Sequence, residues 1–513
     1  VIHGAMKSVF EPGVQPGFML IQPGIADSDL LETQLLTPAL DPPGQISQPP
    51  GGQASGGWLF ANPGGITVSF DFHRYNSIMT VTAGRLYTAE QVRRLDESAI
   101  EAHGIPGIDL MERAGQSVFE SARMAFPAAK KWLIFCGGGN NGGDGYIVAR
   151  RVREAGLSVD VCALKSMDVL TGDAATAAMR WQEAGGETLH WPLQDTGSYD
   201  LLVDALLGTG LDSAPRGDFA LAIDLMNESP AAVIAVDVPS GLNSDTGTVM
   251  GTATEADLTV TFIGLKRGLY TADGPDYAGA VQFSDLETPD SVRDSISDSG
   301  ILIRENIIGD LLPVRRRNSH KGSFGWVLGI GGNSSMSGAV RLCGEAALRS
   351  GAGKVTLATS PDHAALVNLT CPELMVRGVR RGKQLQTLLK QVDVIVIGTG
   401  LGQTSWSEDL FKTCMKTDVP IVLDADGLNI LARLFPEMGR HALPRGNWIL
   451  TPHPAEAGRL LGIGARAVQQ DRVSVAQQLS ERYDDIVILK GCGTVIADQE
   501  GRYAICPLGN PGM

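Results

Sequence analysis

The stretch Cys136-Gly-Gly-Gly-Asn-Asn-Gly-Gly-Asp-Gly145 decides the fold of the first half of this chain. It follows the apolar run 131–136 and precedes a helical pattern over 146–155, so we expect it to join a strand to a helix. Glycine permits positive φ and close approach of a ligand, and free N–H groups at a helix start favour a phosphate. A tight turn without a ligand would also explain the glycines. Two Asn and one Asp, however, are more polar than turning requires.

Short apolar runs alternate with helical patterns on both sides of this stretch. Thr88, with Gln91 three residues later, predicts a capped helix, and a second helix is expected over 106–124. The predicted strands of the first half are 131–136, 159–164, 201–204, 231–238 and 258–262. This alternation predicts parallel strands with crossover helices, in a Rossmann-like doubly wound α/β domain.

A second alternating series follows an acidic, Ser-rich segment over 284–312, where we place the domain boundary. Its predicted strands are 326–330, 354–358, 392–397, 420–423, 448–450 and 486–489, with a helix over 339–350. We therefore expect one α/β domain over 79–290, a linker over 291–312 and a second α/β domain over 313–513.

Residues 1–78 differ from the rest of the chain. Pro and Gly recur through them, as in Gln48-Pro-Pro-Gly-Gly52, without an apolar period that could build a core. We expect this segment to be disordered. Because it begins with Val1 while Met79 precedes the first helical pattern, it is either a non-native extension or a genuine flexible one.

Composition narrows the function classes. The 513 residues exceed what one core organises, and the formal net charge of −15 argues against a nucleic-acid partner. The seven cysteines are widely spaced and form no C-x-x-C pair, so we expect reduced thiols and a cytoplasmic location. No apolar run is long enough to span a membrane, and no secretory signal opens the chain. An acidic protein that handles a small molecule is the expectation.

Acidic and polar residues end the predicted strands of the first half. Asp204 and Asp237 each close a strand, Asn141 lies in the glycine-rich stretch, and Ser240 follows Asp237 closely. The carboxyl ends of parallel strands share one edge, so these side chains should converge there. Their oxygen atoms could hold a hard cation and leave one Asp free for proton transfer. For each Asp taken singly, a helix cap is the rival reading.

The second half also places glycine-rich or polar turns after its strands. They are Gly331–Ala339, Gly398–Gly402, Asp424–Asn429 and Thr451–Glu456. One such turn is weak evidence for a ligand site, but three glycine-rich turns at strand ends are stronger. His453 stands between two prolines, and its place at the rim favours substrate contact over a purely structural role.

These motifs resemble a known family. Residues 88–287 resemble the NAD(P)H-hydrate epimerase domain of YjeF N-terminal type, through 140–145, 203–210 and 236–241. From about residue 301 the chain resembles the ADP-dependent NAD(P)H-hydrate dehydratase domain, which has a ribokinase-like fold. Together they imply a nicotinamide nucleotide repair enzyme with two activities.

For the first half, the resemblance implies epimerisation at C6 of hydrated NADH or NADPH. The residues implied to line the substrate are Asn140, Asn141, Gly142, Gly143, Asp144, Gly208, Thr209, Gly210, Leu211, Asp212, Ser213 and Ala214. Asp237 is expected to be the acid or base. The implied potassium ligands are Asn141, Asp204 and Ser240.

For the second half, the resemblance implies dehydration of the S epimer, with ADP as phosphoryl donor and Mg²⁺. Ala339, Gly402 and His453 match substrate positions, and the adenine nucleotide is expected on Lys490, Gly491, Cys492, Gly493 and Thr494. The family carries a Gly-Thr-Gly-Asp type loop shortly after a segment like Gly509-Asn-Pro-Gly-Met513, where this chain ends. We therefore expect an incomplete second domain that is marginally stable and inactive in dehydration. We also expect a homo-oligomer.

Two other functions stay open from the sequence. Relatives of the first domain act as non-catalytic binding or scaffold modules when their acidic residues are lost, which the presence of Asp204 and Asp237 disfavours. The second half alone would suit a ribokinase-type kinase for a small molecule. Turnover of the hydrated dinucleotide separates these possibilities.

Overall fold

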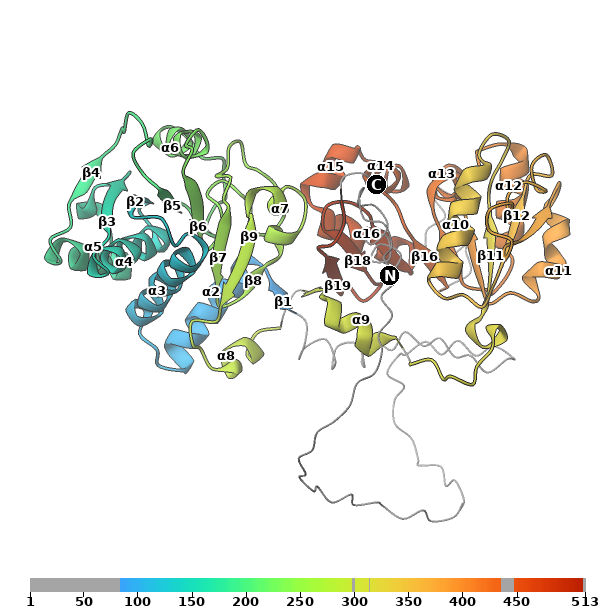
Figure 1. Ribbon diagram of the computed structural model, residues 1–513, viewed down its shortest axis with the longest axis horizontal. Helices are drawn as coiled ribbons and strands as arrows, with labels where there is room; N and C mark the ends of the chain where they lie inside the picture. The colour runs from blue at the N-terminus through green and yellow to red at the C-terminus, as the bar shows by residue number, and fades with distance from the viewer. Residues whose placement is uncertain (1–83, 298–299, 313, 435–446, 511–513) are drawn as a thin grey trace, which may run out of the picture.

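The computed structural model describes residues 84–297, 300–312, 314–434 and 447–510. The extension expected over 1–78 lies outside the described residues, as does the end of the chain at 511–513. Two α/β halves lie along the long axis of the molecule (Figure 1). The mixed α/β fold class predicted from the sequence is confirmed by two largely parallel sheets.

The sheet of the first half has seven parallel strands in the order β4-β3-β2-β5-β6-β7-β9. They are β2 (Lys131–Cys136), β3 (Ser158–Ala163), β4 (Thr188–His190), β5 (Leu201–Ala205), β6 (Ala232–Val236), β7 (Leu258–Phe262) and β9 (Ala280–Ser284). The chain builds this sheet outward from β2 in one direction and then from β5 in the other. That is the Rossmann strand order, and ligands bind where it reverses, here between β2 and β5.

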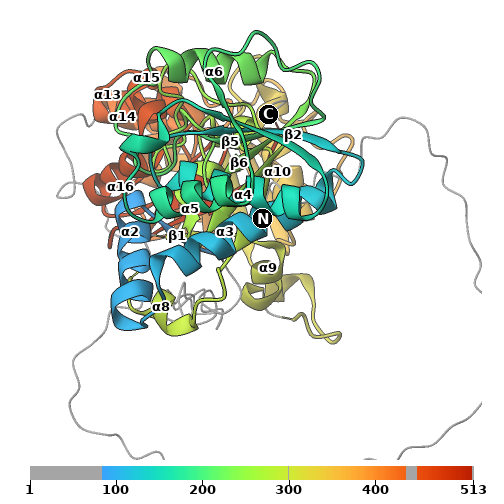
Figure 2. The same ribbon diagram turned by 90° about the vertical axis from the view of Figure 1, so that its left-hand side faces the viewer.

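Helices cover both faces of this sheet, because its strands are apolar on both sides. Trp132 and Ile134 of β2 pack in one core and Leu133 and Phe135 in another. The first core lies under α2 (Ala89–Glu97), α3 (Gly107–Ala125), α4 (Asn140–Glu154) and α5 (Gly172–Glu183), and the second under α6 (Asp218–Asn227). Figure 2 shows α3, α4 and α5 side by side.

The second sheet has twelve strands in the order β13-β12-β11-β14-β15-β16-β17-β18-β19-β10-β1-β8. Its parallel part consists of β11 (Trp326–Ile330), β12 (Lys354–Thr359), β13 (Met375–Gly378), β14 (Val394–Ile397), β15 (Ile421–Leu423), β16 (Trp448–Leu450) and β17 (Ile486–Leu489). The order of these seven repeats that of the first half, with its reversal between β11 and β14. The helices between them include α10 (Ser337–Arg349), α13 (Ala425–Leu434), α14 (Pro454–Leu461) and α16 (Arg472–Tyr483).

Short strands join the two halves. The segment expected as a linker, 291–312, carries β10 (Gly300–Leu302) and α9 (Glu305–Leu311), and α8 (Asp290–Asp294) overlaps its start. Strand β10 pairs antiparallel with β1 (Gly84–Tyr87) and parallel with β19 (Tyr503–Cys506). Because β1 also pairs with β8 (Leu265–Lys266), the second sheet continues into the first half. None of β1, β8, β10 and β19 was among the strands predicted from the sequence.

The capped first helix is confirmed, because Thr88 and Gln91 form a reciprocal capping box. All eleven predicted strands coincide with observed ones within two residues at each end. Helix α4 is different, since it begins at Asn140 rather than Tyr146. The glycine-rich motif thus forms the first turns of the helix and not a turn before it.

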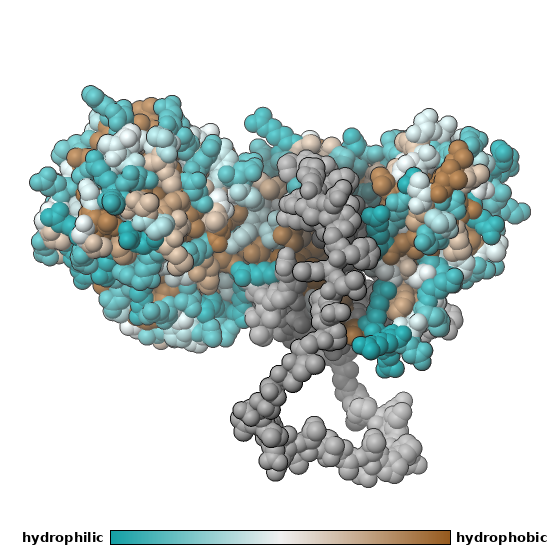
Figure 3. All heavy atoms as spheres, viewed as in Figure 1, coloured by the Kyte–Doolittle hydropathy of each residue, from teal (hydrophilic) through white to brown (hydrophobic). Residues whose placement is uncertain are grey.

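The viewed face in Figure 3 is mostly hydrophilic over the first half, with apolar residues scattered in small groups, as is normal for a surface in water. No helix among the described residues combines the length and apolar character needed to cross a bilayer.

Candidate functional site

A pocket of about 620 Å³ opens at the carboxyl ends of β2, β5 and β6, where the strand order reverses. It brings together most residues predicted from the sequence. Of these, Asn140, Asn141, Asp144, the loop 208–214 and Asp237 line it, whereas Gly142, Gly143, Asp204 and Ser240 do not. Residues far apart in the chain therefore share one site, as the convergence of strand ends predicts.

The glycines of α4 are required by close packing. A Cβ on Gly142 would lie 2.2 Å from the Gly137 carbonyl oxygen, and one on Gly143 would lie 2.7 Å from the Met111 sulfur. A Cβ on Gly145 would lie 2.8 Å from the Cys136 sulfur. None of these glycines has a positive φ, so the backbone conformation expected for them from the sequence is wrong. Their role is to let α4 start directly against β2 and α3.

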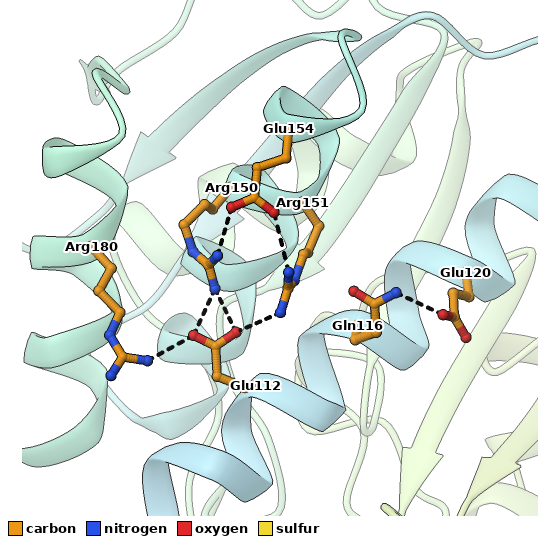
Figure 4. A network of polar contacts seen from close by, with 7 residues as sticks. All are labelled: Glu112, Gln116, Glu120, Arg150, Arg151, Glu154 and Arg180. Carbon is orange, nitrogen blue, oxygen red and sulfur yellow. Dashed lines mark hydrogen bonds and ion pairs between the residues drawn. The ribbon is translucent and has the colours of Figure 1, made fainter.

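A network of ion pairs around Glu112 connects three helices of the first half (Figure 4). Glu112 of α3 accepts hydrogen bonds from Arg150 and Arg151 of α4, at 2.6 and 3.0 Å. It also accepts one from Arg180 of α5, at 2.8 Å. One carboxylate thus joins three helices whose packing fixes the start of α4.

Asp204 and Ser240 lie beneath the pocket in direct contact. The Ser240 hydroxyl donates to Asp204 Oδ1 at 2.6 Å, and the Ser240 backbone N–H donates to Oδ2 at 2.8 Å. The Ser240 oxygen accepts from the Leu207 N–H at 2.8 Å. Burial raises the pKa of Asp204, and the Ser240 hydrogen bonds oppose that rise.

Asn141 faces the same loop from α4. A Cβ on Gly208 would lie 3.4 Å from the Asn141 amide oxygen. Gly208 directly follows Leu207, whose N–H donates to Ser240. The buried Asn141 amide nitrogen has no hydrogen-bond partner. The amide oxygen of Asn141, the hydroxyl of Ser240 and the carboxylate of Asp204 are oxygen ligands of the kind that hard cations prefer.

Asp237 has a strained backbone, with φ at 67° in the left-handed region. Its carboxylate forms a close ion pair with the ammonium of Lys266, and it accepts from Thr261 Oγ1 and the Phe262 N–H, both at 3.2 Å. Lys266 also donates to the Phe262 carbonyl at 2.8 Å. These contacts fix the position of the Asp237 carboxylate at the pocket wall.

Sequence reasoning missed the five further charged residues that line the pocket, which are Arg93, Asp96, Asp173, Arg216 and Lys266. Lys266 of β8 is fully buried, and its signal in the sequence was a lysine directly after the apolar run 262–265. Asp96 follows Val92 by four residues on α2, so it falls on the apolar stripe of that helix. Burial, with the nearby Asp237 charge, raises the pKa of Asp96 to about 6, although Lys266 opposes the rise.

In the second half, the predicted turns also meet at strand ends. The Gly402 N–H donates to the Asp426 carboxylate at 2.8 Å, and a Cβ on Gly400 would lie 2.9 Å from the Ala339 Cβ. His453 caps α14, its Nδ1 accepting from the Ala455 N–H at 3.1 Å. The His453 side chain remains 48% exposed, so the cap leaves one side of the ring open to solvent.

Lys490 joins this edge to the expected nucleotide segment. Its ammonium donates to Asp424 Oδ1 at 2.6 Å, and its backbone N–H donates to the Pro452 carbonyl at 2.8 Å. The following residues pack on the first half, where Thr271 Oγ1 lies 3.2 Å from the Gly493 carbonyl. A Cβ on Gly493 would lie 1.9 Å from the Tyr270 carbonyl oxygen.

Arg472 supports that segment from below. Its side chain is fully buried and donates to Thr271 Oγ1 and to the carbonyls of Leu489 and Lys490, all at 3.2 Å. Burial lowers the pKa of Arg472 to about 10. A buried cation satisfied by neutral oxygens thus fixes the junction between the halves.

Comparisons with known proteins find relatives of both halves of the chain. A family model of the YjeF-related protein N-terminus matches residues 107–268, and one of the NAD(P)H-hydrate dehydratase matches residues 327–513. The bifunctional NAD(P)H-hydrate repair enzyme Nnr of Coxiella burnetii is 43% identical over 428 residues, covering 83% of this chain and 86% of that protein. The protein of the same name from Escherichia coli is 40% identical over 432 residues, covering 83% and 81%.

Among solved structures, the ADP/ATP-dependent NAD(P)H-hydrate dehydratase of Bacillus subtilis, co-crystallised with ATP and Mg²⁺, is 30% identical to this chain. The match covers 41% of this chain and 73% of that one, with a TM-score of 0.36. The curated relatives extend over both halves in the same order. This chain therefore belongs to the family of bifunctional NAD(P)H-hydrate repair enzymes.

Proposed function

We propose that the first half interconverts the R and S forms of hydrated NADH or NADPH. The observation that carries this proposal is the single pocket in which the start of α4, the loop 208–214 and the Asp237–Lys266 pair meet. The N-terminus of α4 suits the pyrophosphate of a dinucleotide. Asp237 lines the same space, and its carboxylate is paired there with the Lys266 ammonium.

We assign Asp237 the role of base. A carboxylate fixed at a pocket wall can accept a proton from a hydroxyl or a water molecule at the reacting carbon. Its strained backbone supports this, since strain of this kind collects at functional sites. The substrate contacts assigned to 140–144 and 208–214 stay part of the proposal.

Potassium is the cation we propose for Asn141, Asp204 and Ser240. The all-oxygen donor set, with Asp204 and Ser240 fully buried, supports it. When bound, the ion would offset the buried charge of Asp204 and stiffen the loop that begins at Leu206.

For the second half we propose ADP-dependent dehydration of the S form, with Mg²⁺. Lys490–Thr494 would hold the adenine nucleotide, and Ala339, Gly402 and His453 the hydrated dinucleotide. The convergence of these turns at the ends of β11, β14, β16 and β17 supports the proposal. ADP, when bound, supplies the phosphoryl group that turns the ring hydroxyl into a leaving group. The reaction is measured as return of 340 nm absorbance from the S hydrate with ADP. The sequence leads us to expect none from this chain, and restored absorbance would contradict that expectation, whereas failure to bind ADP would contradict the proposed site.

Epimerisation is tested with purified R hydrate and chromatographic separation of the two epimers. We expect the chain to bring R and S to equilibrium, and Asp237→Asn to slow this about 10²–10⁴-fold because the proton acceptor is lost. Asp218→Asn on α6, outside the pocket, is the matched control. An unchanged rate in Asp237→Asn would remove the assigned base, and no epimerisation by the unaltered chain would remove the function.

A cytoplasmic location and a homo-oligomeric state also remain proposals. The seven cysteines are free thiols, which supports a reducing compartment. Light scattering during size-exclusion chromatography measures the oligomeric state.

A further inference from the structure

Asp144 is a buried carboxyl that the fold leaves without a partner. It lies in the first turns of α4, lines the pocket and is only 9% exposed. Among the residues that the structure describes, its side chain forms no hydrogen bond or ion pair. Buried polar groups are normally paired, so a carboxyl of this kind is explained by a group that arrives with the substrate.

The charges around Asp144 come from several elements. Asp96 of α2, Asp237 after β6, Lys266 of β8 and the Cys136 thiol of β2 interact with it electrostatically. Arg93, Asp173, Asp212 and Arg216 line the same pocket. Burial, followed by the Asp237 and Asp96 charges, raises the pKa of Asp144 well above its usual range, and Lys266 only partly opposes this.

We propose that Asp144 is a second catalytic residue of the epimerisation, the acid that protonates the hydroxyl leaving C6 while Asp237 receives the proton of the incoming water. This inference rests on the proposed function of the same pocket. The two carboxyls come from different elements, and only Asp237 has a lysine in contact. Two like groups in unlike surroundings divide the acid and base roles between them.

The step balances as an isomerisation. The C6 carbon carries a hydroxyl and the ring nitrogen, so the nitrogen lone pair can form a C=N⁺ bond as the C6–O bond breaks. The hydroxyl leaves as water with the proton of Asp144. A second water then adds to the opposite face, the nitrogen regains its lone pair, and the proton released goes to Asp237. Solvent returns that proton to Asp144, so one water is lost and one is gained.

The test uses the whole chain, purified R hydrate and H₂¹⁸O. We expect each epimerisation to place one ¹⁸O on C6 of the S product, which mass spectrometry measures against a sample without enzyme. We expect Asp144→Asn to lower kcat about 10²–10⁴-fold while the dissociation constant for the hydrate changes roughly threefold or less. Asp144→Glu, which keeps the acid, should recover part of kcat.

The pH profile distinguishes an acid from a structural residue. The proposed acid role needs Asp144 protonated, so kcat should fall on the alkaline side in the unaltered chain. Asp144→Asn should lose the alkaline fall. Asp109→Asn, an exposed carboxylate in the first turn of α3, is the matched control and should keep the full profile.

Three results would overturn the inference: S product without ¹⁸O, Asp144→Asn with kcat within about threefold of the unaltered chain, or an alkaline fall that persists in that variant. Each of these requires the unaltered chain to epimerise, so none can be confused with failure of the proposed function. A chain that interconverts neither epimer would instead contradict the proposed function.

Discussion

At the scale of single residues, the carboxyl groups in and beneath the pocket have different neighbours. Asp237 contacts a fully buried lysine, whereas Asp96 has no cation in contact among the described residues and its pKa is raised to about 6. Asp204 gains hydrogen bonds from Ser240 instead. The same side-chain type therefore has three electrostatic environments within one site.

Asp96 should make stability depend on pH. Its raised pKa means that the folded protein holds a proton that the unfolded chain releases, so stability falls as pH rises from about 4 to about 6. The loss amounts to about 2–3 kcal/mol at neutral pH. We expect Asp96→Asn to be more stable than the unaltered chain at pH 7 and nearly equal at pH 4, as measured by urea unfolding.

The control for this prediction is Asp109→Asn on the neighbouring helix. Its exposed carboxylate should give a small difference that does not change between pH 4 and pH 7. Equal stability of Asp96→Asn and the unaltered chain at both pH values would contradict the prediction.

At the scale of elements, helix α4 shows how a short motif sets a site. Its glycines are buried against β2, α3 and α5, and its open N-terminus faces the pocket. A Cβ added to Gly143 would lie 2.9 Å from the Ala174 Cα of α5. Any side chain on this face must push the helix away from its neighbours.

We expect Gly143→Ala to destabilise the protein by about 1–3 kcal/mol and to slow epimerisation, because α4 must shift at its first turn. Gly338→Ala is the matched comparison, since Gly338 lies in α10 with open space around it. There alanine should stabilise by about 0.4–1 kcal/mol. Urea unfolding measures both, and the same sign for the two variants would contradict the packing argument.

The carboxylate of Glu112 gives a second prediction at this scale. Glu112→Gln leaves Arg150, Arg151 and Arg180 close together without their shared counter-charge. We expect a loss of about 1–3 kcal/mol that shrinks in 1 M salt, as measured by urea unfolding. Glu120→Gln is the control, because Glu120 lies on the same helix and contacts Gln116 alone among the interactions drawn in Figure 4. A loss that does not depend on salt would contradict an electrostatic cause.

The sequence predicted the long elements and the polar strand ends well, because both follow from local patterns. Runs such as 131–136 and 258–262 are apolar throughout, as buried parallel strands must be. The start of α4 was misplaced, because glycine is a poor helix former and only tertiary packing favours it there. Lys266 and Asp96 were missed since their importance comes from neighbours distant in sequence.

At the scale of the whole molecule, the two halves are joined by buried polar contacts as well as by strands. Thr271 of the first half and Arg472 of the second meet at 3.2 Å, and the Ala272 N–H donates to the Cys492 carbonyl at 3.3 Å. The proposed nucleotide segment thus rests on residues that follow Lys266 closely in the chain. The two sites share a structural support.

We expect Arg472→Met to destabilise the second half by about 2–4 kcal/mol, because the carbonyls of Leu489 and Lys490 lose buried donors. Differential scanning calorimetry should then show the heat absorption divided into two transitions. Arg466→Met on α15 (Ala465–Gln470), where the side chain is exposed, is the control. A thermogram of Arg472→Met that matches that of the control would contradict the assigned role.

The place of β1 bears on how the chain is made. It leaves the ribosome before every other described strand, yet its neighbours β8 and β10 are synthesised much later, and β10 must then wait for β19. Until that moment each nascent molecule carries unpaired backbone along this ribbon, which neighbouring polypeptides on one messenger RNA could pair with instead. Chaperone demand during translation should therefore concentrate on these few residues.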